Sequence, residues 1–265
     1  MKLFTPLRPG PRAPLAAANP VAKLGAALVL MAVLFVSVDA VTASVILLGT
    51  VAAVFLSGLS ARSLLGRTWP ILLTALSVGI LNTVLAAPRP GPQLDIGPVS
   101  VSADSAASGV GLGLRLAAIA FSGVLAMATT DPTRLADSLV AQLHLSPRFA
   151  VGALAAARLV PVMAVEWQVL SLARRARGVA GGNPVSWVRI FFGKLLALLI
   201  GAVRRATRLA AAMEARGFGA RPCRTAAREE RVRPADWLLL AAASALGLGA
   251  VGISLALGTW RFLFA

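Results

Sequence analysis

The amino-acid sequence predicts an all-α polytopic membrane protein. Two observations lead to this fold class. Of the 265 residues, 58% are hydrophobic and only 14% are charged, and several apolar stretches are long enough to cross a bilayer. The 26 lysines and arginines outnumber the 10 acidic residues, which gives a net charge of +16. The polar parts should therefore face an anionic membrane surface or acidic partner proteins. We expect about five transmembrane helices and a cytoplasmic coupling domain of three helices.

Five apolar stretches are candidate spans. About 20 apolar residues are needed, because ~30 Å of hydrocarbon is crossed at about 1.5 Å per residue. The stretches are residues 21–38, 41–58, 70–87, 110–129 and 237–257. The first is longer than the apolar region of a cleaved signal peptide and continues directly into the second. We therefore interpret it as a retained span.

Lysines and arginines beside these stretches predict the orientation. The tail 1–20 contains Lys2, Arg8 and Arg12, and the loop between the second and third stretches contains Arg62 and Arg67. Because basic residues accumulate on the cytoplasmic side, both regions should be cytoplasmic. The loop 88–109 has one arginine and is rich in Gly, Pro and Ser. We expect it on the outside.

The segment 131–234 is the most basic part of the chain, with 17 basic and 6 acidic residues. Three helix starts are recognisable in it, each a capping residue followed by proline at the first helical position: Asp131-Pro132, Ser146-Pro147 and Asn183-Pro184. The first helix should be short and amphipathic, since leucines recur every fourth residue from Leu135 to Leu143.

The second and third helices of this segment should extend from Pro147 to about Arg177 and from Pro184 to Arg216. Their apolar first halves are interrupted by Arg158, Pro161 and Glu166 in one helix and by Lys194 in the other. A charge at the bilayer centre costs about 2.5 to 3.5 kcal/mol. We interpret both helices as packed on protein near the cytoplasmic interface. The alternative makes both of them spans, seven in all.

Four regions follow from these assignments. They are a cytoplasmic tail (1–20), a membrane domain with four helices (21–130), a cytoplasmic coupling domain (131–234) and a last transmembrane helix (235–265).

Both long helices end in the same tripeptide. The two ends are Ala176-Arg177-Gly178 and Ala215-Arg216-Gly217. A glycine after the last turn and a basic residue within it are common at helix C-termini. The repetition of the tripeptide in the most basic part of the chain favours a second role, in which each guanidinium enters an acidic groove of a partner.

The two ends and their flanks resemble the transmembrane T component (EcfT/CbiQ type) of energy-coupling factor transporters. Residues 212–219 resemble the second Ala-Arg-Gly signature of that family, and residues 174–178 resemble the first. Further matches are Asn19 to Leu24, Leu81-Asn82, Thr129 to Pro132, and Arg158 to Pro161. They follow the family order along nearly the whole chain.

The resemblance implies a non-catalytic scaffold in the plasma membrane of a prokaryote, with the N-terminus and the coupling domain in the cytoplasm. Its implied partners are two ATP-binding cassette ATPases and a substrate-binding membrane subunit (S component), which together import a vitamin or a metal ion such as cobalt or nickel. Arg177 and Arg216 would be the principal ATPase contacts. The flanking Ala176 and Ala215 would allow close approach, and Gly178 and Gly217 would end the helices. Supporting positions are Arg174, Arg175, Glu214 and Pro161.

The sequence lacks the pattern of an ATP-hydrolysing protein. Its only Gly-Lys pair, Gly193-Lys194, is followed by Leu195, and Val188 stands where a phosphate-binding loop requires glycine. With one histidine and one cysteine, we expect no zinc site of the usual four ligands and no internal disulfide. We also expect no cofactor and no nucleic-acid partner. The alternative function is a self-contained secondary transporter, which should place ionisable residues or broken helices at the midplane, often in inverted repeats.

Overall fold

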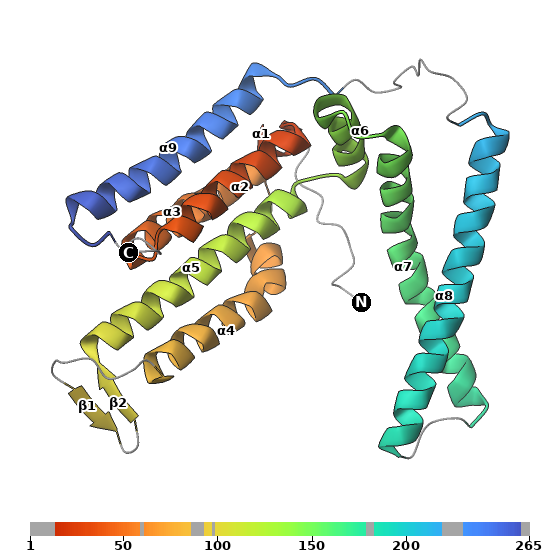
Figure 1. Cartoon of the computed structure of the whole chain (residues 1–265), viewed down its shortest axis with the longest axis horizontal. Helices are drawn as coiled ribbons and strands as arrows, with labels where there is room; N and C mark the ends of the chain where they lie inside the picture. Colours follow the sequence, from red (N-terminus) through yellow and green to blue (C-terminus); the bar gives the residue numbers. More distant parts are fainter. Residues whose placement is uncertain are drawn as a thin grey trace. The chain divides into compact units, whose positions relative to one another are not determined.

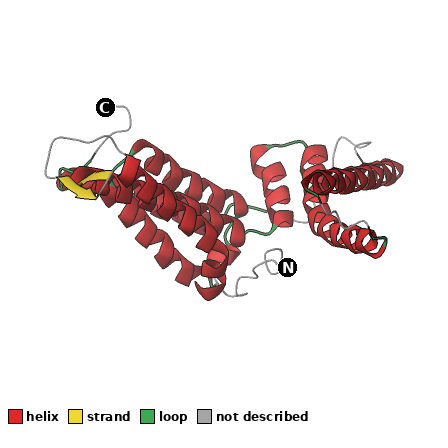
Figure 2. Ribbon diagram, turned by 90° about the horizontal axis from the view of Figure 1, so that it is seen from below, coloured by secondary structure: helices red, strands yellow, loops and turns green. Residues whose placement is uncertain are grey.

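The structure of the protein, a computed structural model, describes residues 14–58, 61–85, 93–96, 99–178, 183–218 and 230–260. In chain order, the elements are α1 (Pro14–Ala17), α2 (Pro20–Val36), α3 (Ala40–Ser57), α4 (Ala61–Leu85), β1 (Gln93–Ile96), β2 (Val99–Ser102), α5 (Ala103–Ala128), α6 (Pro132–Leu143), α7 (Pro147–Ala176), α8 (Pro184–Ala215) and α9 (Pro234–Ala256). Figure 2 shows that helices make up nearly all of the described chain. The all-α prediction is confirmed, apart from one short β-hairpin.

The chain divides into two compact units. The first consists of residues Met1–Ser138 and Glu230–Ala265, and the second of residues Leu139–Glu229. The second unit is therefore an insertion between α6 and α9 of the first. It overlaps the segment 131–234 that the sequence assigns to a coupling domain, but most of α6 belongs to the first unit.

In the first unit, α5 packs against α2, α3 and α4, and α9 packs against α2 and α3 (Figure 1). The core combines large apolar side chains with alanines, among them Leu34, Ile46, Ala118 and Ala250, which are at most 1% exposed. Alanine allows helix backbones to approach closely, which supports packing where lipid surrounds the helices.

Helices α4 and α5 approach most closely at three glycines. A Cβ atom added to Gly109 would overlap the Thr83 hydroxyl and lie 2.5 Å from the carbonyl oxygen of Gly79, and one added to Gly79 would lie 2.9 Å from that of Gly109. Gly113 faces the Ala75 carbonyl in the same way, at 3.3 Å. At Gly79 and Gly109 a larger residue would force the helices to shift, whereas at Gly113 the neighbouring backbone would have to move by only a few tenths of an ångström.

Five described helices are long and apolar enough to cross a membrane: α4 from Thr68, α5 from Asp104, α7, α8 and α9. Helices α2 and α3 are apolar but shorter. The expected number of five is met, but by a different set, because the expected spans included α2 and α3 and did not include α7 and α8. The chain is a multi-pass membrane protein.

Some expected boundaries differ from the structure. The candidate span in α4 begins at Thr68, close to the expected residue 70, but the helix itself begins at Ala61, so Arg62 and Arg67 lie in its first turns and not in a loop. Pro70 lies inside the helix, where it removes one backbone hydrogen bond without ending the helix. The expected loop 88–109 also contains more structure than expected. Strands β1 and β2 pair antiparallel, with Gln93 opposite Ser102, and α5 starts at Ala103 rather than near residue 110.

A buried carboxylate closes one end of the first unit. Asp39 caps α3 by accepting a hydrogen bond from the Thr42 N–H (2.7 Å), and it also accepts bonds from the hydroxyls of Ser37 and, at 2.7 Å, of Ser254 in α9. Burial opposes ionisation of Asp39, but these hydrogen bonds outweigh it and lower its pKa. The turn between α2 and α3 is thereby fixed to the end of α9.

Candidate functional site

The second unit presents α7 and α8 as an antiparallel pair, and Figure 1 shows the two helices crossing. At the crossing the Trp167 ring meets the Phe191 ring edge-on, with centroids 5.4 Å apart. Lys194 lies over Trp167 at 4.4 Å, and Arg174 donates a hydrogen bond of 2.9 Å to the Ile190 carbonyl. The contacts therefore join the second half of α7 to the first half of α8.

An ion pair continues this contact toward the end of α8. Arg205 donates two hydrogen bonds to the Glu166 carboxylate, of 2.8 and 2.6 Å. The charge of Glu166 is thereby paired within the second unit. Glu214 makes no ion pair among the described residues. It belongs to the exposed last turn of α8.

The two Ala-Arg-Gly tripeptides form nearly identical helix ends. Helix α7 ends at Ala176 and α8 at Ala215, and the arginine that follows has φ −86° and ψ 9° at Arg177 and φ −85° and ψ 8° at Arg216. The next residue is in the left-handed region in both cases, with φ 72° at Gly178 and 74° at Gly217. Glycine is required at this position because side chains strain such a backbone.

Backbone hydrogen bonds stabilise the ends in matching fashion. The N–H of the glycine donates to the carbonyl three residues earlier, at 3.0 Å from Gly178 to Arg175 and at 2.8 Å from Gly217 to Glu214. At the second end, the Phe218 N–H also donates to the Met213 carbonyl at 3.0 Å, which completes a Schellman motif. The position of each arginine is thus fixed by backbone geometry.

All six residues of the two tripeptides are exposed. Within the described residues, neither the Arg177 nor the Arg216 side chain makes a hydrogen bond or an ion pair. Each guanidinium is therefore exposed at a helix end, and its donors are not used within the described part of the chain. Five N–H donors in a planar fork suit a carboxylate of a partner.

The residues expected to support the two arginine tips lie in different environments. Arg174 is half-buried against α8, where its guanidinium lies over the bare Cα of Gly193. Arg175 is exposed and lines a pocket at the crossing. Pro161 is exposed in the middle of α7, where it removes one backbone hydrogen bond and the helix continues through it.

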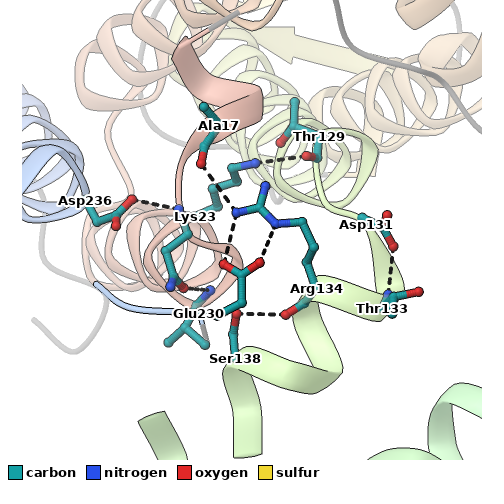
Figure 3. Close-up of polar contacts among 11 residues, drawn as sticks. Ala17, Lys23, Thr129, Asp131, Thr133, Arg134, Ser138, Glu230 and Asp236 are labelled. Atoms are coloured by element: carbon teal, nitrogen blue, oxygen red, sulfur yellow. Dashed lines mark hydrogen bonds and ion pairs between the residues drawn. The ribbon is translucent and has the colours of Figure 1, made fainter. Parts of the chain in front are cut away.

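A second group of polar contacts lies in the first unit, where the chain leaves for the insertion and returns from it (Figure 3). Arg134 of α6 binds Glu230 through two hydrogen bonds, of 2.7 and 3.0 Å. These bonds raise the pKa of Arg134, although burial acts in the opposite direction. The pair joins residues separated by 96 positions in the chain.

The same polar group fixes the starts of α2 and α9. The Asp236 carboxylate, 2% exposed, accepts hydrogen bonds of 2.7 Å from the backbone N–H groups of Asn19 and Arg233. Lys23 donates to the Thr129 carbonyl at 2.9 Å. Asn19, Lys23 and Thr129 lie in segments that carry the family resemblance, whereas the pairing of Arg134 with Glu230 was not expected from the sequence. The sequence signal for these contacts was the position of two acidic residues, Glu230 and Asp236, close to Pro234, the proline at which α9 starts.

Taken together, these features define a class of protein. It is a helical multi-pass membrane protein that presents two matching, arginine-tipped helix ends. In the described part of the chain no three His, Cys, Asp or Glu side chains gather into a possible metal site.

The comparisons with known proteins agree with this class. A family model described as CbiQ, cobalt transport protein, matches residues 12–226. A protein from Thermosediminibacter oceani, named energy-coupling factor transporter transmembrane protein EcfT, is 31% identical over 219 residues, or 79% of this chain and 81% of its own length. The protein of the same name from Streptococcus thermophilus is 31% identical over 243 residues, 87% of this chain and 90% of its own. The chain belongs to the CbiQ/EcfT family of transporter membrane proteins.

Proposed function

We propose that the chain is the scaffold subunit of an energy-coupling factor importer and that its two arginine tips dock into two ATP-binding cassette ATPases. The observation that carries this proposal is the near-identity of the two helix ends in torsion angles, capping bonds and exposure. Two equal tips suit two equivalent grooves.

The spacing of the tips supports two separate partners. The Arg177 tip lies one turn beyond Arg174, which contacts Ile190 near the start of α8. The Arg216 tip lies 26 residues beyond Ile190 along the same helix, or about 40 Å at 1.5 Å per residue. One small groove does not span this distance, whereas a pair of ATPase subunits does.

The α7–α8 crossing supplies a pivot for motion. The Trp167–Phe191 contact, the Arg174 hydrogen bond and the Glu166–Arg205 pair hold the helices together between the tips. When the ATPases close on ATP, their approach would move both tips and change the crossing angle of the helices. That change would reorient the bound substrate-binding subunit and release its cargo inward.

Exposed apolar side chains support a membrane-embedded partner on the same helices. On α8 they recur at helical spacing, at Val185, Val188, Phe192, Leu196, Leu199 and Val203, each at least 46% exposed. On α7, Val162, Val165, Val169 and Leu172 form a similar stripe. Faces of this size are normally covered by lipid or protein. We assign part of this surface to the substrate-binding membrane subunit, with the helices at the cytoplasmic interface of a prokaryotic plasma membrane and the N-terminus inside. The cargo class, a vitamin or a metal ion, follows from that subunit.

Co-purification tests the docking role. The double variant Arg177→Ala plus Arg216→Ala is expressed with its partners in the native membrane, and the ATPases recovered with the tagged chain are quantified. Removing one partner of a buried charge pair costs about 3 to 5 kcal/mol, so ATPase recovery should fall at least about tenfold.

The matched control removes two exposed α8 arginines away from the tip, in Arg204→Ala plus Arg208→Ala. Its ATPase recovery should stay at the wild-type level. Equal recovery from the tip variant and the control variant would refute the docking role.

A further inference from the structure

A pocket of about 330 Å³ lies between α7 and α8 on one side of their crossing. Its lining combines basic and aromatic side chains. Arg174, Arg175 and Lys194 supply three positive charges, and Trp167, Trp187 and Phe191 supply three rings, with Ser171 and Ile190 completing the wall. Among the described residues no acidic side chain lines it. Three uncompensated cations around one cavity favour an anionic occupant.

The aromatic rings hold the pocket in shape. Trp187 stacks on Phe191 with the rings 16° from parallel and their centroids 5.7 Å apart, and Phe191 meets Trp167 edge-on. The three rings thus form a continuous wall contributed by both helices. A wall built from packed rings does not need its occupant in order to form.

The cations are held at the rim by specific contacts. Lys194 lies over the Trp167 ring and within 3.2 Å of the Ser171 hydroxyl. Arg174 fits over Gly193, where a Cβ atom would come within 3.1 Å of its guanidinium, and one of its N–H groups binds the Ile190 carbonyl. An arginine carries five N–H donors and a lysine three, so this set retains donors for phosphate oxygens.

The surroundings of the pocket select between a free and a lipid-bound phosphate. Exposed apolar side chains lie in the adjoining turns of both helices: Val169 and Leu172 of α7, and Val188 and Phe192 of α8, between 46% and 63% exposed. Tryptophan beside lysine and arginine, next to an apolar surface, is the composition of a membrane interface. A lipid supplies both the phosphate and the acyl chains that such a surface accommodates.

We infer that this pocket binds the phosphodiester headgroup of an anionic phospholipid. The phosphate oxygens accept hydrogen bonds from Lys194, Arg174 and Arg175, and the acyl chains lie along the apolar side chains of the adjoining turns. The site lies within the second unit and does not depend on docking of the helix tips to ATPases.

A titration of the full chain in detergent tests the site, with Trp167 and Trp187 providing a fluorescence signal inside the pocket. The probes are dihexanoyl phosphatidylglycerol, dihexanoyl phosphatidylcholine and inorganic phosphate. The wild type should bind the glycerol lipid at least about tenfold more tightly than the choline lipid, because each basic side chain near an anionic headgroup adds to affinity.

The variant Arg175→Gln plus Lys194→Gln should lose this preference while keeping both tryptophans. The control Arg189→Gln plus Arg204→Gln removes two α8 charges outside the lining and should keep it. Circular dichroism verifies that both variants are folded. The inference is overturned by equal affinity for the two lipids, by an equal loss in the control, or by inorganic phosphate binding as tightly as phosphatidylglycerol.

Discussion

The arginines of this chain occupy two contrasting environments. Arg134 is 30% exposed and binds a glutamate that is 15% exposed, whereas Arg177 and Arg216 are exposed at helix ends. A guanidinium that already has an internal partner stabilises the fold, and one held at a rigid exposed tip is available to another protein. Substitutions at the first kind of arginine should therefore lower the stability of the fold. Substitutions at the second kind should weaken assembly with partner proteins.

The Arg134–Glu230 pair leads to a stability prediction. Glu230→Gln keeps the size of the side chain but removes the carboxylate that binds the half-buried Arg134 guanidinium through two hydrogen bonds. Since exposed pairs contribute under about 1 kcal/mol and breaking a buried pair costs about 3 to 5, we expect a loss of about 1 to 3 kcal/mol. Thermal unfolding of the purified chain in detergent should show an apparent Tm lower by several degrees.

The control for this prediction is Glu214→Gln, which changes an exposed glutamate that makes no ion pair in the described structure. It should leave the Tm within about one degree of wild type, as surface substitutions usually do. A Tm for Glu230→Gln equal to that of Glu214→Gln would show that the pair contributes nothing to stability.

At the residue scale, the helix ends were predictable and the ion pair was not. Gly178 and Gly217 adopt the positive φ that a glycine after a basic last turn indicates, because capping is a local property of the chain. Arg134 and Glu230 meet only because the chain returns to the same end of the bundle after an insertion. No local pattern contains that information.

At the element scale, helix starts with a capping residue and a proline were placed well. Helices α6, α7 and α8 begin at Pro132, Pro147 and Pro184 as expected, because proline fits the first turn and lacks the N–H that would stay unpaired there. Pro70 was expected only as the approximate start of an apolar stretch, and it lies inside α4. Transmembrane helices tolerate an internal proline because neighbouring groups satisfy the freed carbonyl, so a proline alone does not mark where such a helix begins.

The close approach of α4 and α5 gives a prediction for a whole element. Gly109→Ala places a methyl group against Thr83 and the Gly79 carbonyl, so the helices must separate or shift, at a cost of about 1 to 3 kcal/mol. The apparent Tm in detergent should fall by several degrees.

The same substitution at Gly252 of α9 is the matched control, since a Cβ atom there meets nothing within 4 Å. Alanine is the better helix former by up to about 1 kcal/mol, so Gly252→Ala should not lower the Tm. If both alanine variants behave alike, the glycine contact does not determine how α4 and α5 pack.

At the scale of the whole molecule, composition predicted the membrane class. The charge distribution predicted a basic coupling domain at 131–234, and the structure has a second compact unit, Leu139–Glu229, that overlaps this segment. Which helices cross the bilayer was harder to predict, because α7 and α8 combine spanning length with paired internal charges such as Glu166 and Arg205. Pairing lowers the cost of such charges, and pairing between helices is not visible in a single sequence.

A self-contained secondary transporter, the alternative function, would need no protein partner at the helix tips. The scaffold proposal requires both tips to touch ATPases in the cell. The most informative probes are therefore crosslinkers placed close to each tip at positions that leave the two arginines unchanged. Ala173 and Ala212 lie four residues before Arg177 and Arg216, are exposed, and occupy equivalent places on the two helices.

Photo-crosslinking from these two positions is the most direct measurement. Ala173 and Ala212 are replaced, one at a time, by p-benzoylphenylalanine in cells that contain the native partners, with the exposed Ala156 and Ala197 as mid-helix controls. The scaffold proposal predicts adducts with ATP-binding cassette ATPases from both tip positions and none from the controls. ATPase adducts from neither tip position, or only from the mid-helix controls, would contradict it.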